Sequence, residues 1–231
     1  MSGVGVKMHE QIKSFVIRNG RCGAKQNAAY LYGLCQYGLT THNIPWCFDS
    51  IFGRRAETIV EIGFGMGHSL VTMAKNNPGQ NFLGIEVHRP GIGQLLSEVL
   101  ACGIKNLRVA PFDAQLAFAS CIPAGSLAGI QIYFPDPWPK KRHFKRRLVQ
   151  TEFVNSLSKA LQVGGYFHCA TDWEPYAQYM LEQITPCYEL KNTSHDHTFV
   201  DKPTWRPQTK FEKRGLDLGH NVFDLLYTKE V

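Results

Sequence analysis

The sequence predicts a doubly wound α/β fold built on a largely parallel sheet. From Thr58 onward, short runs rich in β-branched and aromatic residues alternate with segments of helical periodicity. The strand-like runs are TIVEIGFG, NFLGIEVH, NLRVAPFD, IQIYFPDP and GYFHCATD. The helical segments are SLVTMAKN, IGQLLSEVLACG, LVQTEFVNSLSKALQ and EPYAQYMLEQI. Strands that alternate with helices of about 8 to 15 residues form right-handed βαβ crossovers, and such crossovers make neighbouring strands parallel.

One domain is expected for most of the chain, because 231 residues with 44% apolar residues suffice for a single packed core. Two late strands are predicted at Tyr188 to Lys191 and Val222 to Thr228. The polar, proline-bearing segment between them is so long that we expect it to be functional. Residues 1–50 are weakly patterned and begin with basic side chains. We therefore expect a basic, mobile N-terminal arm and lead-in there, and one domain over residues 51–231.

The net positive charge of the chain comes from one segment. Lys140 to Arg147 contains six Lys/Arg and no acid; without those six, the 25 basic residues fall to 19, which equals the number of acidic residues. A patch of this kind indicates a surface for a polyanion.

Cysteine usage and hydropathy indicate the compartment. The seven cysteines include no C-x-x-C pair, so we expect reduced thiols and no metal site. The N-terminus lacks the apolar core of a signal peptide, and no segment approaches 18 uninterrupted apolar residues. We therefore expect a cytoplasmic protein that makes no membrane contact.

A glycine-rich turn follows the first predicted strand. In VEIGFGMGHSL, the strand delivers Glu61 and then Gly63, Gly65 and Gly67 before a helix begins. Glycines at this place let the backbone pass close to a ligand at the carboxyl edge of the sheet, so we count Gly63 and Gly65 as cofactor-binding residues. The spacing is G-x-G-x-G, unlike the G-x-G-x-x-G of dinucleotide sites, and this favours a cofactor without phosphate.

Four consecutive predicted strands end in acids, namely Glu61, Glu86, Asp113 and Asp136. Each of them taken alone could be a solvated or helix-capping side chain. Four in register at one edge favour a shared site that would repel phosphates. Such a site suits a ligand with a ribose, an adenine amine, an ammonium and a sulfonium, and S-adenosylmethionine carries these groups.

The segment YFPDPWPKKRHFKRRL (133–148) joins an acid to the basic block. Two prolines flank Trp138 and fix the backbone after Asp136. Trp138 could stack on a planar base or merely cap the core. The basic residues could neutralise phosphates, with His143 and Phe144 interleaved as stacking surfaces, or form a solvated face or a localisation signal. We expect the acid and prolines to build a reaction site to which the positive charge brings a nucleic acid.

Acids in two later segments could choose the base. Asp172 follows the fifth predicted strand, and Glu212 lies in RPQTKFEKRG (206–215), which could also be a solvated loop. Two carboxylates can accept hydrogen bonds from the N1–H and the exocyclic amine of guanine, which leaves N7 free on the other edge.

At this point the sequence resembles the bacterial tRNA (guanine-N7)-methyltransferase family. The matching stretches are VEIGFGMG, FLGIEVHRPGIG, YFPDPWPKKRHFKRRL, ATDWEPYAQYML and RPQTKFEKRGLDLGHNVFDL, and the combination of FPDPWPKKRH with TKFE-x-RG is far more specific than a glycine motif. The resemblance implies a Rossmann-like class I methyltransferase fold with an antiparallel last strand. It also implies transfer of a methyl group from S-adenosylmethionine to N7 of the variable-loop guanosine of tRNA, position 46 in tRNA numbering, so tRNA is the expected partner.

The resemblance also implies residue roles at the matching positions. Implied cofactor contacts are Glu61, Glu86, Asp113 and Asp136, and Asp136 is also the implied catalytic aspartate. Implied substrate contacts are Lys140, Asp172, Thr209, Lys210, Phe211 and Glu212. The implied RNA-interacting segment comprises Arg142, His143, Phe144, Lys145, Arg146 and Arg147.

Because N7 of guanine carries a lone pair and no proton, we expect catalysis by alignment and electrostatics without a general base. Two other functions stay open. An NAD-type oxidoreductase could use the same fold and Glu86, although the glycine spacing, the row of acids and the basic block disfavour it. A non-catalytic RNA-binding protein could keep the fold, although it would not need Asp136, Asp172 and Glu212. Methylation of another RNA or of free nucleotides is a further alternative.

Overall fold

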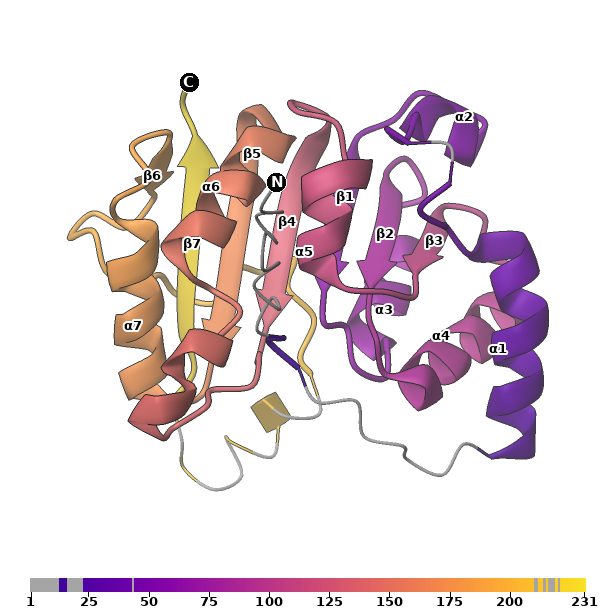
Figure 1. The fold of residues 1–231 in the computed structure, drawn as a ribbon, viewed down its shortest axis with the longest axis horizontal. Helices are drawn as coiled ribbons and strands as arrows, with labels where there is room; N and C mark the ends of the chain where they lie inside the picture. Colours follow the sequence, from indigo (N-terminus) through magenta and orange to yellow (C-terminus); the bar gives the residue numbers. More distant parts are fainter. Residues whose placement is uncertain are drawn as a thin grey trace, which may run out of the picture.

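A computed structural model describes residues 13–15, 23–42, 44–209, 212–213, 215, 219 and 221–231. Its centre is a seven-stranded sheet with the order β3-β2-β1-β4-β5-β7-β6 (Figure 1). Strands β1 to β5 are parallel, and β7 runs antiparallel to both β5 and β6. The strands are β1 (Thr58–Ile62), β2 (Asn81–Ile85), β3 (Leu107–Ala110), β4 (Leu127–Tyr133), β5 (Leu161–Thr171), β6 (Leu190–Asn192) and β7 (Phe223–Lys229).

Helices cover both faces of the sheet (Figure 1). They are α1 (Ala24–Tyr37), α2 (Phe48–Phe52), α3 (His68–Asn76), α4 (Arg89–Cys102), α5 (Ala114–Leu116), the π-helical turn η1 (Ala117–Cys121), the 3₁₀-helix η2 (Lys141–Arg146), α6 (Thr151–Ala160) and α7 (Glu174–Ile184). Within the described residues, no helix has both the length and the apolar character needed to cross a membrane.

The buried residues of β1 belong to two different core clusters. Ile59 packs into a cluster with residues of α1, α3 and α4, whereas Val60 packs into a second cluster with residues of α6 and α7. Because both faces are covered, all five residues of β1 are buried and the strand reads as an apolar run with one acid. The chain leaves β1 toward β2 and β3 and then returns to place β4 on the other side of β1. This reversal creates a crevice at the carboxyl ends of β1 and β4.

The five early strands, the two late strands, and helices α3, α4, α6 and α7 lie at the places that the sequence predicts. Helix α1 falls within residues 1–50, helix α2 begins there and ends at Phe52, and neither was predicted. Helix α1 packs on α4 through glycines: a Cβ added at Gly93 would lie 2.4 Å from the backbone oxygen of Gln26. Trp46 and Phe48 are buried in the core as well. The packed unit therefore includes residues before 51.

Candidate active site

A cavity of about 260 Å³ lies at the crevice between the carboxyl ends of β1 and β4. Three of the predicted acids line it: Glu86 after β2, Asp113 after β3 and Asp136 after β4. Gly63 and Gly65 form part of another wall. The remaining lining is mostly apolar, including Ile62, Ile85, Val87, Phe112, Phe134 and Leu148. The cavity thus offers an apolar slot for a flat ring together with carboxylates for polar groups.

The glycine turn after β1 adopts backbone conformations that other residues rarely take. The φ angles of Gly63 and Gly65 are +73° and +56°. A Cβ added at either residue would meet no atom within 4 Å, so the turn needs glycine for its backbone conformation and leaves open space on its outer side. A ligand could therefore approach this backbone closely.

Glu86 joins the glycine turn to the end of β2. Its Oε2 accepts a hydrogen bond from the Gly65 N–H at 3.0 Å. Its Oε1 accepts from the N–H groups of Val87 at 2.6 Å and His88 at 2.9 Å. These three backbone donors hold the carboxylate in a fixed orientation at the edge of the cavity.

Glu61 and Asp113 occupy different surroundings. Asp113 caps α5, because its Oδ1 accepts from the Gln115 N–H at 2.9 Å. Glu61 is buried inside β1 and does not line the cavity; its Oε1 accepts from the Ser69 hydroxyl at 2.8 Å. Its Oε2 has no hydrogen-bond partner among the described residues. Burial raises the pKa of Glu61 to about 7, which the Ser69 hydrogen bond partly opposes.

The turn that carries Asp136 is strained and tightly held. Asp136 is exposed, and the nearby Phe134 and Trp138 have φ angles of +50° and +43°, a region that side chains other than glycine rarely adopt. The Phe134 N–H donates to the carbonyl of Ala170 on β5 at 2.7 Å. The Trp138 indole N–H donates to the carbonyl of Ser14 at 3.2 Å. Strain of this kind persists only where surrounding contacts fix the backbone, and it is typical of functional sites.

The basic block forms η2 directly after this turn. Lys140, Lys141, Arg142 and Lys145 are exposed to solvent. His143 meets the edge of Trp138 with ring centroids 5.7 Å apart, and the Arg146 guanidinium lies 5.3 Å from the Trp138 ring. Desolvation, followed by the charges of Arg142, Arg146 and Lys140, lowers the pKa of His143. The exposed cations form a surface beside the cavity, and Trp138 connects the two.

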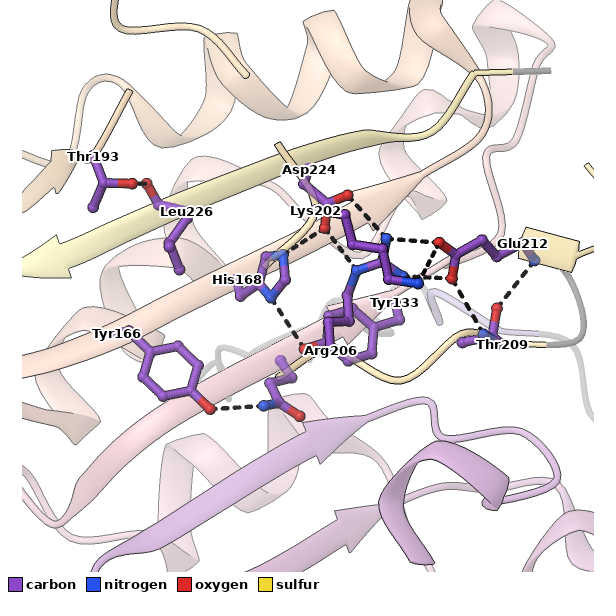
Figure 2. A network of polar contacts seen from close by, with 11 residues as sticks. Tyr133, Tyr166, His168, Thr193, Lys202, Arg206, Thr209, Glu212, Asp224 and Leu226 are labelled. Atoms are coloured by element: carbon purple, nitrogen blue, oxygen red, sulfur yellow. Dashed lines mark hydrogen bonds and ion pairs between the residues drawn. The ribbon is translucent and has the colours of Figure 1, made fainter. Parts of the chain in front are cut away.

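A buried polar network anchors the segment between β6 and β7 to the sheet (Figure 2). The Arg206 side chain, fully buried, donates from Nη1 to Glu212 Oε2 at 2.8 Å and from Nη2 to Glu212 Oε1 at 3.0 Å. It also donates from Nη2 to Asp224 Oδ2 at 2.9 Å, and its Nε lies 2.8 Å from Asp224 Oδ1. On β5, His168 Nε2 lies 2.7 Å from Asp224 Oδ1, and the Tyr133 hydroxyl lies 3.1 Å from His168 Nδ1. A neutral His168 satisfies both contacts by donating from Nε2 and accepting at Nδ1.

A known protein family matches most of this chain. A family model described as "Putative methyltransferase" matches residues 55–225. The tRNA (guanine-N(7)-)-methyltransferase of Pasteurella multocida (strain Pm70) is 47% identical over 220 residues, which cover 95% of this chain and 86% of that relative. The protein of the same name from Shewanella baltica (strain OS195) is 49% identical over 223 residues, which cover 96% and 94%. The chain belongs to the tRNA (guanine-N(7)-)-methyltransferase family.

Solved structures with low sequence identity share the fold of this family member. The 16S rRNA methyltransferase KamB has a TM-score of 0.60 at 12% identity, covering 80% of this chain and 93% of that chain. The aminoglycoside resistance methyltransferase NpmB1 has a TM-score of 0.54 at 14% identity, with coverage of 83% and 94%. The predicted class I methyltransferase fold, including its antiparallel last strand, is confirmed.

In this methyltransferase family member, the structure gives two predicted contact residues other partners. Glu212 faces Arg206 and also lies 2.9 Å from the Lys202 ammonium, so it does not line the cavity. Arg147 is 2% exposed and turns away from the exposed cations of η2. In both cases a charged side chain that looks like a surface group in the sequence has found partners inside the protein.

The remaining predicted substrate contacts lie in two segments of the chain. Asp172 is half-buried and directly follows β5, the neighbour of β4. Thr209 and Glu212 cap each other, because each backbone N–H donates to the other's side chain at 3.2 and 3.1 Å respectively. Lys210 and Phe211 lie outside the described residues.

Sequence reasoning missed Arg206, Asp224 and His168. The available signal was a charged or titratable residue in an otherwise apolar strand, as in GYFHCATD and VFDLLYT. Nothing in one sequence indicates that two such strands are neighbours, and Arg206 lies in a segment without periodicity.

Proposed function

We propose that this chain transfers a methyl group from S-adenosylmethionine to N7 of guanosine in tRNA, at the variable-loop position 46. The observation that carries the proposal is the acid-lined cavity with the exposed Asp136 at its rim, directly followed by the exposed cations of η2. The printed names of the close relatives support the base and the substrate. We assign the activity to the cytoplasm, with tRNA as the partner.

The cavity fits S-adenosylmethionine by the chemistry of its donor groups. Glu86, fixed by three backbone N–H groups at the end of β2, would accept the ribose hydroxyls. Asp113 lies where an adenine amine would find an acceptor, between apolar side chains that would enclose the ring. The Oε2 of Glu61 has no hydrogen-bond partner among the described residues, but Glu61 does not line the cavity, so we assign it to supporting the glycine turn from inside β1.

The residues around the cavity would act by positioning. S-adenosylmethionine, when bound, supplies an electrophilic methyl group. Because N7 of guanine carries no proton, no residue needs to remove one. Asp136 is exposed at the cavity rim, where its carboxylate can hold donor groups of the base and stabilise positive charge that develops on the purine. Asp172, at the end of the neighbouring strand, supplies a second carboxylate at the same edge.

The structure changes the expected part of Glu212. Although burial opposes it, hydrogen bonds from Arg206 and Lys202 lower the pKa of Glu212, so the carboxylate is charged and already paired. We therefore assign Glu212 to holding the Thr209 segment in place, in addition to any contact with guanine. Thr209 N–H and Glu212 N–H are satisfied by the mutual cap and fix this part of the loop.

The test is transfer of labelled methyl from S-adenosylmethionine to unmodified tRNA, followed by nucleoside analysis of the product. We expect N7-methylguanosine with the wild type and none with Asp136→Ala. Label on another base or another RNA would keep the cofactor assignment and overturn the base assignment. Bound tRNA without any transfer would favour a non-catalytic RNA-binding protein.

A further inference from the structure

Arg147 differs from every other cation of the basic block in its burial. Only 2% of its surface is exposed, whereas Lys140, Lys141, Arg142 and Lys145 are open to solvent. A cation that contacts tRNA phosphates must reach solvent, and Arg147 does not. It therefore needs a separate explanation.

The guanidinium of Arg147 is enclosed by aromatic rings. Its Cζ lies 3.6 Å from the centroid of Phe144, 4.3 Å from that of Tyr179 and 5.1 Å from that of Tyr176. Phe144 is three residues earlier, which in a 3₁₀-helix places the two side chains on one face. No carboxylate pairs with Arg147 among the described residues. The ring faces therefore take the place of a counter-ion.

Among the described residues, the guanidinium of Arg147 makes one hydrogen bond, and it is to the strained turn. Arg147 Nε donates to the carbonyl oxygen of Pro137 at 2.9 Å. Because proline has no N–H, this carbonyl is the only backbone group of Pro137 that can be held by a hydrogen bond. Pro137 lies between Asp136 and Trp138, whose φ of +43° requires external support.

The aromatic enclosure ties the same turn to a second acid. Tyr176 and Tyr179 belong to α7, which begins two residues after Asp172. Arg147 thus links the residue that follows Asp136 to the helix that follows Asp172. Its stacking on α7 and its bond to Pro137 therefore bridge the two segments that carry these carboxylates.

We propose that Arg147 is a positioning residue that sets Asp136 relative to Asp172 and makes no phosphate contact. The inference rests on the proposed methylation of tRNA and changes the role of one residue in its RNA-binding segment. It predicts that the shape of the guanidinium matters as well as its charge.

The substitution Arg147→Lys separates the two roles. Lysine keeps the charge and would still bind a phosphate, but it cannot stack as a plane while donating from Nε. We expect its single-turnover rate at saturating tRNA to fall by about 10- to 100-fold, because small misplacements of reacting groups have effects of this size. The KM for tRNA and the salt dependence of binding should match the wild type.

Arg142→Ala is the matched control, since Arg142 is an exposed cation of the same helix. It should flatten the log–log salt slope of tRNA binding by about 0.7 to 0.9 and change the saturated rate much less than Arg147→Lys does. A normal saturated rate in Arg147→Lys, or a flattened salt slope in Arg147→Ala equal to that of Arg142→Ala, would overturn the positioning role.

A readout without activity uses protein labelled with 5-fluorotryptophan, in which Trp138→Phe identifies the ¹⁹F signal of Trp138 among the four tryptophans. We expect Arg147→Lys to shift this signal and Arg142→Ala to leave it in place; an unmoved signal in Arg147→Lys would contradict the proposal.

Should Arg147→Lys fail to fold, Phe144→Leu removes one stacking face and should shift the signal in the same way. A wild type that does not methylate tRNA would refute the proposed function, while the ¹⁹F signal would still decide the role of Arg147.

Discussion

Asp136 is exposed, and its turn contains two residues with positive φ, so we propose it as the acid nearest to the reacting base. Its turn is fixed on both sides, by Phe134 on β5 and by Trp138 on Ser14. Fixed carboxylates beside a cation that develops during reaction act through charge, and they do not need to titrate. This view predicts how the rate responds when the charge of Asp136 is removed.

Asp136→Asn should lower the single-turnover rate by about 100-fold or more at every pH, because the amide keeps the shape and removes the charge. The pH profile of the wild-type rate should contain no inflection that is missing from the profile of Asp136→Asn. The measurement is methyl transfer under single-turnover conditions from about pH 5.5 to 8.5. A unit-slope fall of the wild-type rate below about pH 6 to 7, absent in a variant that keeps its high-pH activity, would instead show that Asp136 accepts a proton.

Glu61 makes folding stability depend on pH. Its pKa is about 7 in the folded protein against an ordinary value of 4.5, so the folded state holds the proton more tightly. The contribution of Glu61 to the free energy of unfolding is therefore complete below about pH 4.5. It is lost as the pH rises to about 7, and the loss amounts to about 3 kcal/mol. Glu61→Gln cannot titrate, so it should gain stability relative to the wild type between pH 5 and pH 8. Chemical unfolding of both proteins at the two pH values measures this, and an unchanged difference would contradict the burial of an ionisable Glu61.

At the scale of elements, Arg206 joins the segment before β7 to β7 itself, and Asp224 of β7 in turn contacts His168 of β5. Glu212 and Asp224 are each 2% exposed, and both pair with this one guanidinium, while Glu212 also pairs with Lys202. The mutual cap of Glu212 and Thr209 belongs to the same segment, so the network also holds Thr209 in place. Burial keeps His168 uncharged, since desolvation lowers its pKa more than Asp224 raises it.

Arg206→Met should destabilise the fold by about 3 to 5 kcal/mol, because it leaves buried Asp224 without a cation and buried Glu212 with only the half-exposed Lys202. Lys202→Met is the matched control: it also removes a cation from Glu212, but the side chain of Lys202 is 36% exposed and the expected loss is about 0 to 1 kcal/mol. Urea unfolding of the three proteins gives the comparison. Equal losses in the two variants would show that the buried network is not what holds this segment.

Helix η2 presents its exposed cations beside the cavity, and this arrangement predicts how tRNA binding responds to salt. Arg142→Glu and Lys145→Glu should each weaken tRNA binding and flatten the log–log salt slope by about 0.7 to 0.9. Lys75→Glu, at the exposed end of α3 on the opposite edge of the sheet, should leave the slope unchanged. Filter binding at several salt concentrations is sufficient. If the substitutions in η2 leave the salt slope of tRNA binding unchanged, the basic block is only a solvated face.

Across the whole molecule, the sequence predicts what depends on local pattern. Apolar runs that end in acids predicted β1 to β4 and the carboxylates of the cavity. In a parallel sheet, the carboxyl ends of these strands lie at one edge, so the acids that follow them also lie there. The position of the basic surface, which η2 carries, was also predictable, because a cluster of like charge is visible in the sequence itself.

Contacts between distant segments could not be predicted in this way. Helix α1 packs on α4 through Gly33 and Gly93, and close approach of glycines leaves no apolar periodicity to detect. The partners of Arg206 come from β7 and from the segment between β6 and β7, and Asp224 of β7 in turn contacts His168 of β5. The adjacency of these segments appears only in the folded chain. Arg147 looks like its neighbours in the sequence, and only the aromatic residues of α7 turn it inward.

The most direct test of the account is to map the methylated position in tRNA by strand cleavage at N7-methylguanosine after reaction with the wild-type protein. We predict a single cleavage at the variable-loop guanosine, and its loss when that guanosine is replaced by adenosine. Cleavage at another guanosine, or methylation that survives the replacement, would contradict the assignment of the acidic cavity and helix η2 to this one substrate position.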